Sequence, residues 1–541
     1  MPQQITTYSN PLLPGFNPDP SIIYHAESGF FYLITSTFHL YPGLPIYASR
    51  DLKSWTHIGN AINRPEQLSL EKAHMVAMPL DTGKKMMGAG GLFAPTIRFA
   101  RGRFWVICTN AVIDGNGEGK EREEGEEGEE GEEGFNVRNF IIHTDDIWSG
   151  KWSDPINLDF HGIDPSLFFD DDNDGKVYFQ GCFFINRLQQ PSCTIKQFEI
   201  DPETGEKLSD EKEIWGGHAR YDTEGPHIYK RGEWYYLLVA EGGTFEHHML
   251  CIARSKRNPI LSADGKDEVI QNVGHGVLVQ EGEGGWWAVA LAVQDVNRNK
   301  ELGEDFVAPL GRQSFLAPVE WPEGGWPRVE QPRLEFSAKA VGDDKGEGIN
   351  GSYGLGNLFI RTPDLSKYQI SCDGKAPILM RPSVEGFSAS QGTCSFVGRR
   401  QGYPDSFCTA TLNISGLSNG IRAGVALYKD NLRHVALVYN ASDRKVRCSV
   451  TTLDGEKTLS AKLQIDANEA EVQFQIVAYA TGWDFFSKES RHETWTKIGS
   501  MSAVDFCARE MTGPIFGLFA RADRAEATNE FVEFTAFETD S

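Results

Sequence analysis

Three acidic residues from widely separated stretches of the chain share one local sequence context. Asp19 and Asp164 are each followed by Pro-Ser, and Glu224 is followed by Gly-Pro. A carboxylic acid and a carboxylate on opposite sides of a reacting bond can act as general acid and general base. Hydrolysis of a glycosidic bond needs such a pair. A single Asp-Pro-Ser is an ordinary turn, so the case for chemistry depends on repetition at one register.

The chemistry also restricts the spacing and the charge of these carboxyl groups. In an inverting glycosidase the acid and the base lie roughly 6.5–9.5 Å apart, which leaves room for the attacking water. A third carboxylate nearby raises the pKa of the acid, because like charges disfavour ionisation. The acid then stays protonated near neutral pH. Three carboxylates that converge on one point would therefore suit this reaction.

Five aromatic-rich segments mark a repeated unit in the first ~330 residues. Each follows a turn signal that contains glycine, and aromatic and β-branched residues favour strands. The segments are FFYLITSTF (30–38), FWVICTN (104–110), KVYFQGC (176–182), WYYLLVA (234–240) and WWAVALA (286–292). A shorter strand candidate precedes each one, and these five resemble one another. They begin at Asp19-Pro-Ser, Ala94-Pro-Thr, Asp164-Pro-Ser, Gly225-Pro-His and His275-Gly-Val.

This repeat predicts an all-β fold with a five-bladed β-propeller, because radial repetition of small antiparallel sheets is typical of that architecture. Proline is tolerated at the first residue of a strand, where no ladder donor is needed. The first strand of each blade should line the central channel, so the five strand heads, with Glu224 just before Gly225, should converge at its mouth. A generic β-sandwich with coincidental prolines is the alternative.

Six segments of the chain together resemble glycoside hydrolase family 43. They are NPLLPGFNPDPSI, STFHLYPGLPIYASRDLKSW, GLFAPTIRF, GIDPSLFFDDDNDGKVYF, TEGPHIYKRGEWYYLLVAEGGT and PLGRQSFL. The resemblance implies a five-bladed propeller and an inverting mechanism. It implies that Asp19 is the general base, that Asp164 orients the acid and modulates its pKa, and that Glu224 is the general acid.

The same resemblance implies further residues around the sugar. Arg312, in LGRQSFL, is similar to the family arginine that contacts the substrate, and Thr244 is expected to bind the substrate as well. Phe38 and Phe93 resemble aromatic walls of the sugar pocket, although the family usually has tryptophan at the second position. His275 resembles the family histidine at the channel centre, beside a calcium ion or a water. The chemistry requires no cofactor, and a structural calcium near His275 is the one metal expected; read alone, this histidine would be a core residue.

The remainder of the chain predicts a second domain. We expect the propeller at 1–335, a polar and glycine-rich linker at 336–355, and a β-sandwich of jelly-roll type at 356–541, because strands there alternate with turns every 8–12 residues. This part resembles the C-terminal sandwich of family members active on xylan fragments; a separate carbohydrate-binding module is the alternative. The glutamate-rich segment 117–133 cannot bury apolar surface and predicts a solvated loop.

Bulk properties exclude some partners. The formal net charge of -24 argues against nucleic acid and anionic membranes. No window approaches the roughly 20 apolar residues of a transmembrane helix. The N-terminus lacks the basic start and the apolar run of a signal peptide, which favours the cytoplasm over secretion.

The leading hypothesis is an exo-acting inverting β-xylosidase that releases xylose, and also arabinose, from xylo-oligosaccharides or arabinoxylan. D-xylopyranose and L-arabinofuranose can present similar hydroxyl patterns, so one pocket can serve both. A dedicated α-L-arabinofuranosidase that removes side chains from arabinoxylan is the second hypothesis. A non-catalytic sugar-binding propeller is the third, and it would be favoured by loss of one carboxylate.

Overall fold

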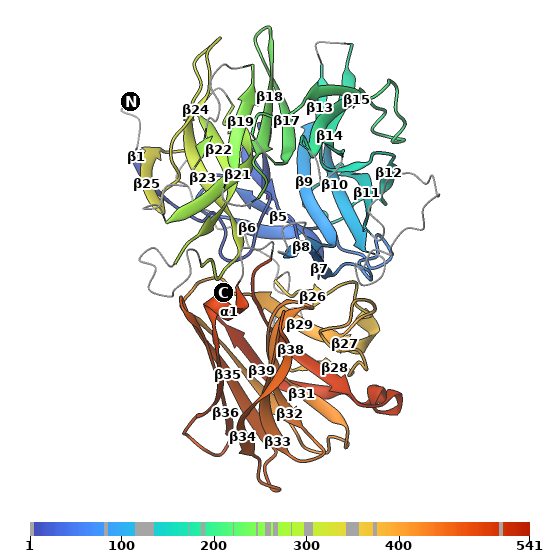
Figure 1. The fold of residues 1–541 in the computed structure, drawn as a ribbon, viewed down its shortest axis with the longest axis vertical. Coiled ribbons are helices and arrows are strands. Elements are labelled where there is room, and N and C mark those ends of the chain that lie inside the picture. Colours follow the sequence, from blue (N-terminus) through green and yellow to red (C-terminus); the bar gives the residue numbers. More distant parts are fainter. Residues whose placement is uncertain are drawn as a thin grey trace.

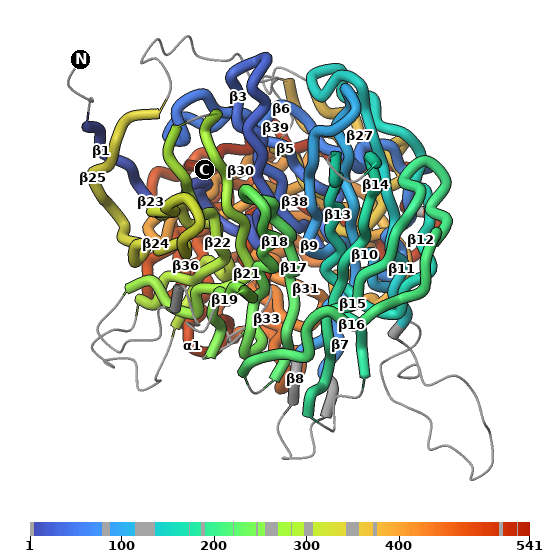
Figure 2. The backbone as a smooth tube through the Cα atoms, turned by 90° about the horizontal axis from the view of Figure 1, so that it is seen from above, coloured from blue at the N-terminus to red at the C-terminus, as the bar shows by residue number. Residues whose placement is uncertain are grey.

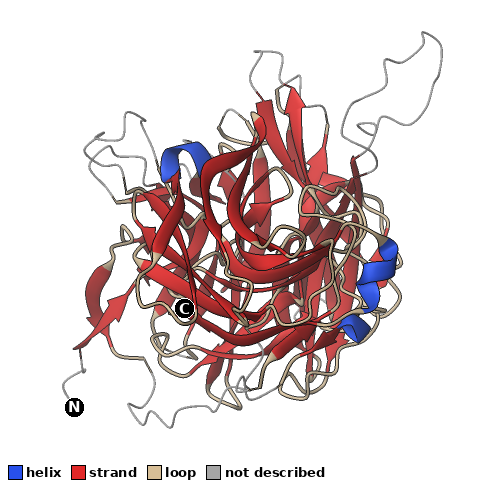
Figure 3. Cartoon of the chain, turned by 90° about the horizontal axis from the view of Figure 1, so that it is seen from below, coloured by secondary structure: helices blue, strands red, loops and turns tan. Residues whose placement is uncertain are grey.

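The computed structural model describes residues 5–79, 85–113, 135–171, 174–185, 190–219, 221–244, 247–254, 261–262, 269–282, 284–296, 307–341, 356–371, 376–507 and 512–540. These residues form two bodies, a propeller of N-terminal strands and a sandwich of C-terminal strands (Figure 1), which confirms the predicted all-β class. Within these residues helix is confined to α1 (Ala503–Phe506) and two 3-10 turns, Leu365–Lys367 and Ala525–Asn529 (Figure 3). In the described part no helix is long and apolar enough to cross a membrane. The acidic segment 117–133 lies outside the described residues.

Five four-stranded antiparallel sheets form the propeller, which confirms the predicted blades. Each aromatic run lies in the second strand of its blade. The blades are β2 (Ser21–His25), β3 (Phe30–Ile34), β5 (Gly43–Ser49) and β6 (Thr56–Ile62); β9 (Gly91–Ala100), β10 (Arg103–Ile113), β11 (Phe135–Thr144) and β12 (Ile156–Leu158); β13 (Gly162–Asp170), β14 (Lys176–Phe184), β15 (Cys193–Glu199) and β16 (Lys212–Trp215); β17 (Thr223–Arg231), β18 (Trp234–Glu241), β19 (Met249–Ala253) and β20 (Leu261–Ser262); and β21 (Ile270–Gln280), β22 (Trp286–Gln294), β23 (Arg312–Glu320) and β24 (Arg328–Val329).

Two short strand pairs complete this body. β7 (Met75–Pro79) pairs with β8 (Lys85–Ala89). β1 (Ile5–Ser9) pairs with β25 (Glu335–Lys339), and the two lie together at one edge of the molecule (Figures 1 and 2). The first residues of the segment predicted as a linker therefore belong to a strand, while 342–355 lie outside the described residues.

The five strand heads share one backbone conformation. Asp19, Ala94, Asp164, Gly225 and His275 have φ values of 50°, 43°, 55°, 56° and 35°. In the second to fifth blades, the first strand has one residue more than the second strand that pairs with it, and this extra residue falls at the strand head. Such a bulge bends the strand and redirects a side chain. The repeat seen in the sequence is therefore a repeated bulge, and it turns each head away from the regular pleat.

Hydroxyl groups just after these heads join adjacent blades. In three of the repeats the residue two positions beyond the head is Ser or Thr, and its oxygen bonds the backbone of the next blade. The bonds run from Thr96 Oγ1 to Pro165 O, from Ser166 Oγ to Pro226 O, and from Ile97 N to Ser21 Oγ. Because each bond joins two inner strands, the heads are fixed relative to one another.

The C-terminal body is a sandwich of two antiparallel sheets, as predicted. One sheet has the order β27 (Tyr368–Gln369), β28 (Ile378–Met380), β39 (Val532–Thr539), β30 (Ser406–Asn413), β35 (Glu471–Tyr479), β36 (Gly482–Glu489) and β37 (Thr496–Ser502). The other has the order β29 (Ser395–Arg400), β38 (Ile515–Ala522), β31 (Ile421–Asp430), β32 (Arg433–Asn440), β33 (Lys445–Thr452) and β34 (Gly455–Gln464). Buried and less buried residues alternate along β35, as expected for a strand with one face in the core.

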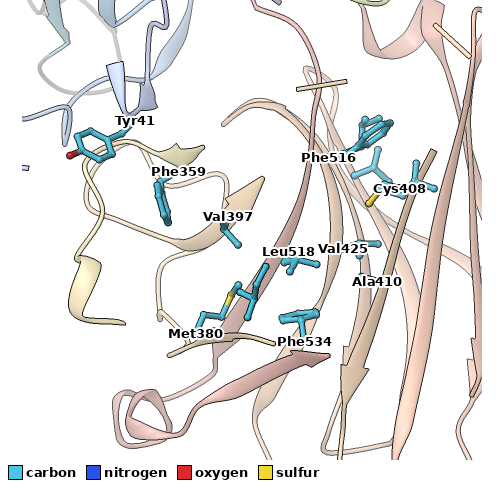
Figure 4. Close-up of a cluster of buried hydrophobic side chains, with 14 of the residues drawn as sticks. Tyr41, Phe359, Met380, Val397, Cys408, Ala410, Val425, Phe516, Leu518 and Phe534 are labelled. Atoms are coloured by element: carbon cyan, nitrogen blue, oxygen red, sulfur yellow. The ribbon is translucent and has the colours of Figure 1, made fainter. Parts of the chain in front are cut away.

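The two bodies share backbone pairing and core. β4 (Leu40–Tyr41) leaves the first blade and pairs with β26 (Phe359–Ile360). Figure 4 shows a buried cluster in which Tyr41 lies beside Phe359 and, further on, the sandwich core around Leu518. Asn431, in the β31–β32 turn, donates to Met75 O and accepts from Met75 N at 3.1 and 2.8 Å. The sandwich is therefore an integral part of the fold.

Replacement of Asn431 by Ala should lower the free energy of unfolding by about 1–3 kcal/mol, because both backbone groups of buried Met75 lose their partner. Urea or thermal unfolding measures the change. Asn529→Ala, at an exposed position, serves as the control and should stay within about 0.5 kcal/mol of wild type. An unchanged stability of Asn431→Ala would contradict the interface described here.

Candidate functional site

Asp19 is a buried carboxylate held by two partners. Ala94 N donates to Ser36 Oγ at 2.7 Å, so the Ser36 hydroxyl hydrogen is directed to Asp19 Oδ2 at 2.6 Å. Arg312 lies against both oxygens, with Nη1 3.1 Å from Oδ1 and Nη2 3.4 Å from Oδ2. Among the described residues no donor makes a hydrogen bond to Oδ1. Its nearest charged partner is Arg312 Nη1.

Arg312, the first residue of β23, connects this carboxylate to the other predicted substrate-binding residues. Its Nη1 donates to Thr244 Oγ1 at 3.2 Å. Its guanidinium carbon lies 5.3 Å from the centre of the Phe38 ring, and the Phe38 and Phe93 rings are 5.2 Å apart. The structure therefore brings Phe38, Phe93, Thr244 and Arg312 together beside Asp19.

Asp164 lies at the head of the third blade and faces the fourth and fifth. Gly225 N donates to its Oδ2 at 3.1 Å, and His275 Nδ1 lies 3.5 Å from the same oxygen. Burial raises the pKa of Asp164, the His275 imidazole opposes that rise, and the Asp19 carboxylate adds to it. The predicted residues of four blades thus meet at one place.

Glu224, the second residue of β17, is the carboxyl group most strongly held in its neutral form. Burial raises its pKa well above the ordinary value, and the Asp164 and Asp222 carboxylates raise it further. A side chain at its neighbour Gly225 would be strained by the φ of +56°, and its Cβ atom would lie 3.1 Å from His275 Nδ1, which is closer than an ordinary contact. The site therefore holds both Glu224, whose surroundings favour the neutral form, and Asp19, which lies against a guanidinium.

Asp164, Glu224 and His275 also form a group that could hold a cation, since their ligand atoms lie within 4.8 Å of one another. Calcium takes six to eight oxygen ligands, whereas this group offers two carboxylates and a ring nitrogen. A cation bound by Glu224 would also remove its proton. These three residues fit the calcium predicted near His275 poorly, and no step of the chemistry depends on it.

Three supporting residues were not predicted from the sequence. Ser36 lies within a strand-like aromatic run, and nothing in its spacing signals a bond to Asp19. His248 Nε2 lies 3.9 Å from Glu224 Oε1. Glu241 is fully buried and accepts bonds from Trp215 Nε1, Thr223 Oγ1 and two backbone N–H groups. It therefore fixes the connection between β16 and β17 that leads into Glu224.

Comparison with known proteins gives matches over both bodies. The family model named Glycosyl hydrolases family 43 matches residues 8–327, and the model named Beta xylosidase C-terminal Concanavalin A-like domain matches residues 355–540. The chain is 30% identical to a non-reducing end alpha-L-arabinofuranosidase of Bacteroides ovatus, across 97% of this chain and 93% of that protein. It is 31% identical to a xylosidase/arabinosidase of Butyrivibrio fibrisolvens, across 86% of each. A solved family 43 protein of Bacillus licheniformis aligns over 99% of both chains, with a TM-score of 0.79 and 26% identity.

Because the pKa of Glu224 is raised in the folded protein, we expect the stability of the protein to depend on pH through this group. The folded protein keeps this proton above pH 4.5, the ordinary value, whereas the unfolded chain releases it. The stabilisation is complete below that pH and is lost as pH rises toward the folded-state pKa, by up to about 1.4 kcal/mol per pH unit. Glu224→Gln has no proton to lose, so its Tm should rise relative to wild type between about pH 5 and about pH 7. Glu233→Gln, at an exposed position in the same blade, should show a constant difference. A constant difference for Glu224→Gln would contradict the raised pKa.

Proposed function

Because this chain belongs to glycosyl hydrolase family 43, we propose that it is an exo-acting, inverting glycosidase that releases single xylose units from the ends of xylo-oligosaccharides. Arabinose linked to arabinoxylan is the second sugar that this site should release. In this proposal Glu224 is the general acid, Asp19 the general base and Asp164 the group that keeps the acid protonated.

The state of Glu224 is the observation that carries this proposal. A general acid must hold a proton until the leaving oxygen needs it, and efficiency is greatest when its pKa lies near the working pH. Burial and the adjacent Asp164 both raise the pKa of Glu224. The raised pKa of Asp164 has the same main cause, so the two carboxyl groups together hold at least one proton more readily than isolated side chains would.

Asp19 has the environment that a general base needs. The Ser36 hydroxyl donates to Oδ2, and the Arg312 guanidinium lies against both carboxylate oxygens. With Oδ2 bound by Ser36, Oδ1 is the oxygen that would accept the proton of the attacking water. Inversion then requires this water on the face of the sugar opposite to Glu224.

Exo action is supported by the wall beside the sugar-binding residues. Phe38 belongs to a buried cluster with Phe16, Met75 and Met87, and Phe93 and Leu432 pack against that cluster. Leu432 comes from the β31–β32 turn of the sandwich, next to Asn431, which is bound to Met75. The sandwich thus contributes to the wall, and a closed end would admit one terminal sugar at a time.

The choice between the two sugars divides the relatives. The relative from Bacteroides ovatus is named an arabinofuranosidase, and the one from Butyrivibrio fibrisolvens is named for both activities. Arg312 and Thr244 offer several donors to hydroxyl groups, and such contacts suit any pentose that presents the same pattern. A dedicated arabinofuranosidase is therefore the second candidate function.

Substrate specificity is tested with p-nitrophenyl β-D-xylopyranoside, p-nitrophenyl α-L-arabinofuranoside and xylotriose. We expect hydrolysis of both chromogenic substrates, and we expect xylotriose to give xylose and xylobiose first. Turnover of the arabinoside with no release of xylose from xylotriose would favour the dedicated arabinofuranosidase. Larger products from polymeric xylan would contradict exo action.

The roles of acid and base are tested with two leaving groups. Glu224→Gln should reduce kcat/KM for phenyl β-D-xylopyranoside by about 10²–10⁴-fold. The loss should be about tenfold or less for the 2,4-dinitrophenyl xyloside, because that leaving group needs no proton. Asp19→Asn should lose a similar factor with both substrates, since the water needs its base in each case. An equal loss for both substrates in Glu224→Gln would contradict its role as the acid.

A further inference from the structure

His248 is a buried histidine that lies beside the acid but belongs to no predicted set. It directly precedes β19, and its side chain is fully buried. Its Nδ1 lies 3.2 Å from Asn272 O, on β21 of the next blade, and its Nε2 lies 3.9 Å from Glu224 Oε1. The ring therefore bridges the fourth and fifth blades and ends at the carboxyl group of Glu224.

The hydrogen on this ring can be placed from its partner. A backbone carbonyl oxygen only accepts hydrogen bonds, so Nδ1 must carry the hydrogen that it donates to Asn272 O. Burial, and after it the nearby His275, lowers the pKa of His248 to about 3, so the ring is neutral. Nε2 then has a bare lone pair, and among the described residues it has no hydrogen-bond partner.

The group that faces this lone pair is the carboxyl of Glu224, whose pKa is raised by burial and by the Asp164 carboxylate. A gap of 3.9 Å is longer than a hydrogen bond. Catalytic hydrogen bonds are often long without substrate and tighten in the complex. A protonated Glu224 oxygen can donate a hydrogen bond to the lone pair of His248 Nε2. An ionised Glu224 would be repelled by the same lone pair.

The ring is also held in place. A Cβ atom on Gly274 would lie 2.4 Å from His248 Cδ2 and Nε2, so the imidazole packs directly on a bare backbone carbon. Asn272, which receives the Nδ1 hydrogen, has a φ of 54°. A fixed and neutral ring cannot deliver protons from solvent, but it can define where a neighbouring proton lies.

We propose that His248 is a positioning residue for the acid: its Nε2 accepts a hydrogen bond from the carboxylic proton of Glu224 and so holds the acid in its proton-bearing form and orientation. For transfer, the O–H of Glu224 turns from Nε2 to the leaving oxygen, so the hydrogen bond to Nε2 breaks before the proton is given up. The carboxylate that remains faces the Nε2 lone pair and is repelled by it. This inference deepens the proposed function and rests on Glu224 being the general acid.

The test compares two replacements of the ring. His248→Phe keeps a flat ring without an acceptor, and His248→Gln keeps an acceptor near the position of Nε2. We expect His248→Phe to lose about tenfold in kcat/KM with phenyl β-D-xylopyranoside, a part of the acid's contribution, and to keep nearly the wild-type rate with the 2,4-dinitrophenyl xyloside. His248→Gln should recover most of the loss. His247→Phe, at the exposed neighbour, is the matched control and should resemble wild type.

A structural role would give a different pattern. An equal loss with both leaving groups, or no loss at all, would overturn the inference. If His248→Phe does not fold, His248→Asn replaces it, because asparagine keeps a donor for Asn272 O but does not reach the ε position; it should show the same dependence on the leaving group. If Glu224→Gln shows no such dependence, the proposed function itself fails. If Glu224→Gln shows it and the His248 variants do not, only this inference fails.

Discussion

The left-handed backbone at the head of each inner strand is the constraint from which the whole site is built. A residue with a side chain is strained by roughly 1–2 kcal/mol in this conformation, and Asp19, Ala94, Asp164 and His275 all adopt it. Strain of this kind persists only where the surrounding structure over-determines the backbone. Here the proline or glycine that follows each head and the hydroxyl bridges between blades supply that surrounding structure. The bulge then directs each head toward its counterparts.

Electrostatics follows from this convergence. Ionising all three carboxyl groups at one buried site costs free energy, because desolvation disfavours each charge and like charges repel. Arg312 lies against Asp19 and stabilises one negative charge. For Asp164 and Glu224 burial is the largest influence, and each rises in pKa. One fold therefore gives similar side chains different surroundings: Asp19 lies against the Arg312 guanidinium, whereas burial is the largest influence on Asp164 and Glu224.

The sequence predicted the repeated parts of this molecule better than the connections between them. Pro-start strands and aromatic runs are local signals, and they were sufficient for the five blades, for the sandwich and for the place of Asp19, Asp164, Glu224 and His275. The segment after residue 335 was predicted as a linker because its composition is polar. Its strand β25 exists through pairing with β1, more than 300 residues away. No local pattern encodes such a contact.

The same limit explains the supporting residues that were not predicted. Ser36 contacts Asp19 only because two strands of one blade place them together, and His248 reaches Glu224 only because the β18–β19 connection passes beside the fourth strand head. Their types are common in cores, and their spacing carries no signal. Candidate site residues could be predicted from the sequence where a motif recurs. They could not be predicted where a single side chain contacts the site only through the tertiary fold.

The proposed inversion requires Asp19 and Glu224 to act from opposite faces of the sugar, with the attacking water on the side of Asp19. Proton NMR of p-nitrophenyl β-D-xylopyranoside hydrolysis in its first seconds tests this arrangement directly, because all the xylose released is newly formed and its anomeric proton reports the configuration before mutarotation. Water delivered by Asp19 to a β-linked xyloside should give α-xylose first, with the β-anomer appearing only as the two forms equilibrate. If β-xylose appears first, a carboxylate attacks the sugar directly, and the assignment of Asp19 as a general base is wrong.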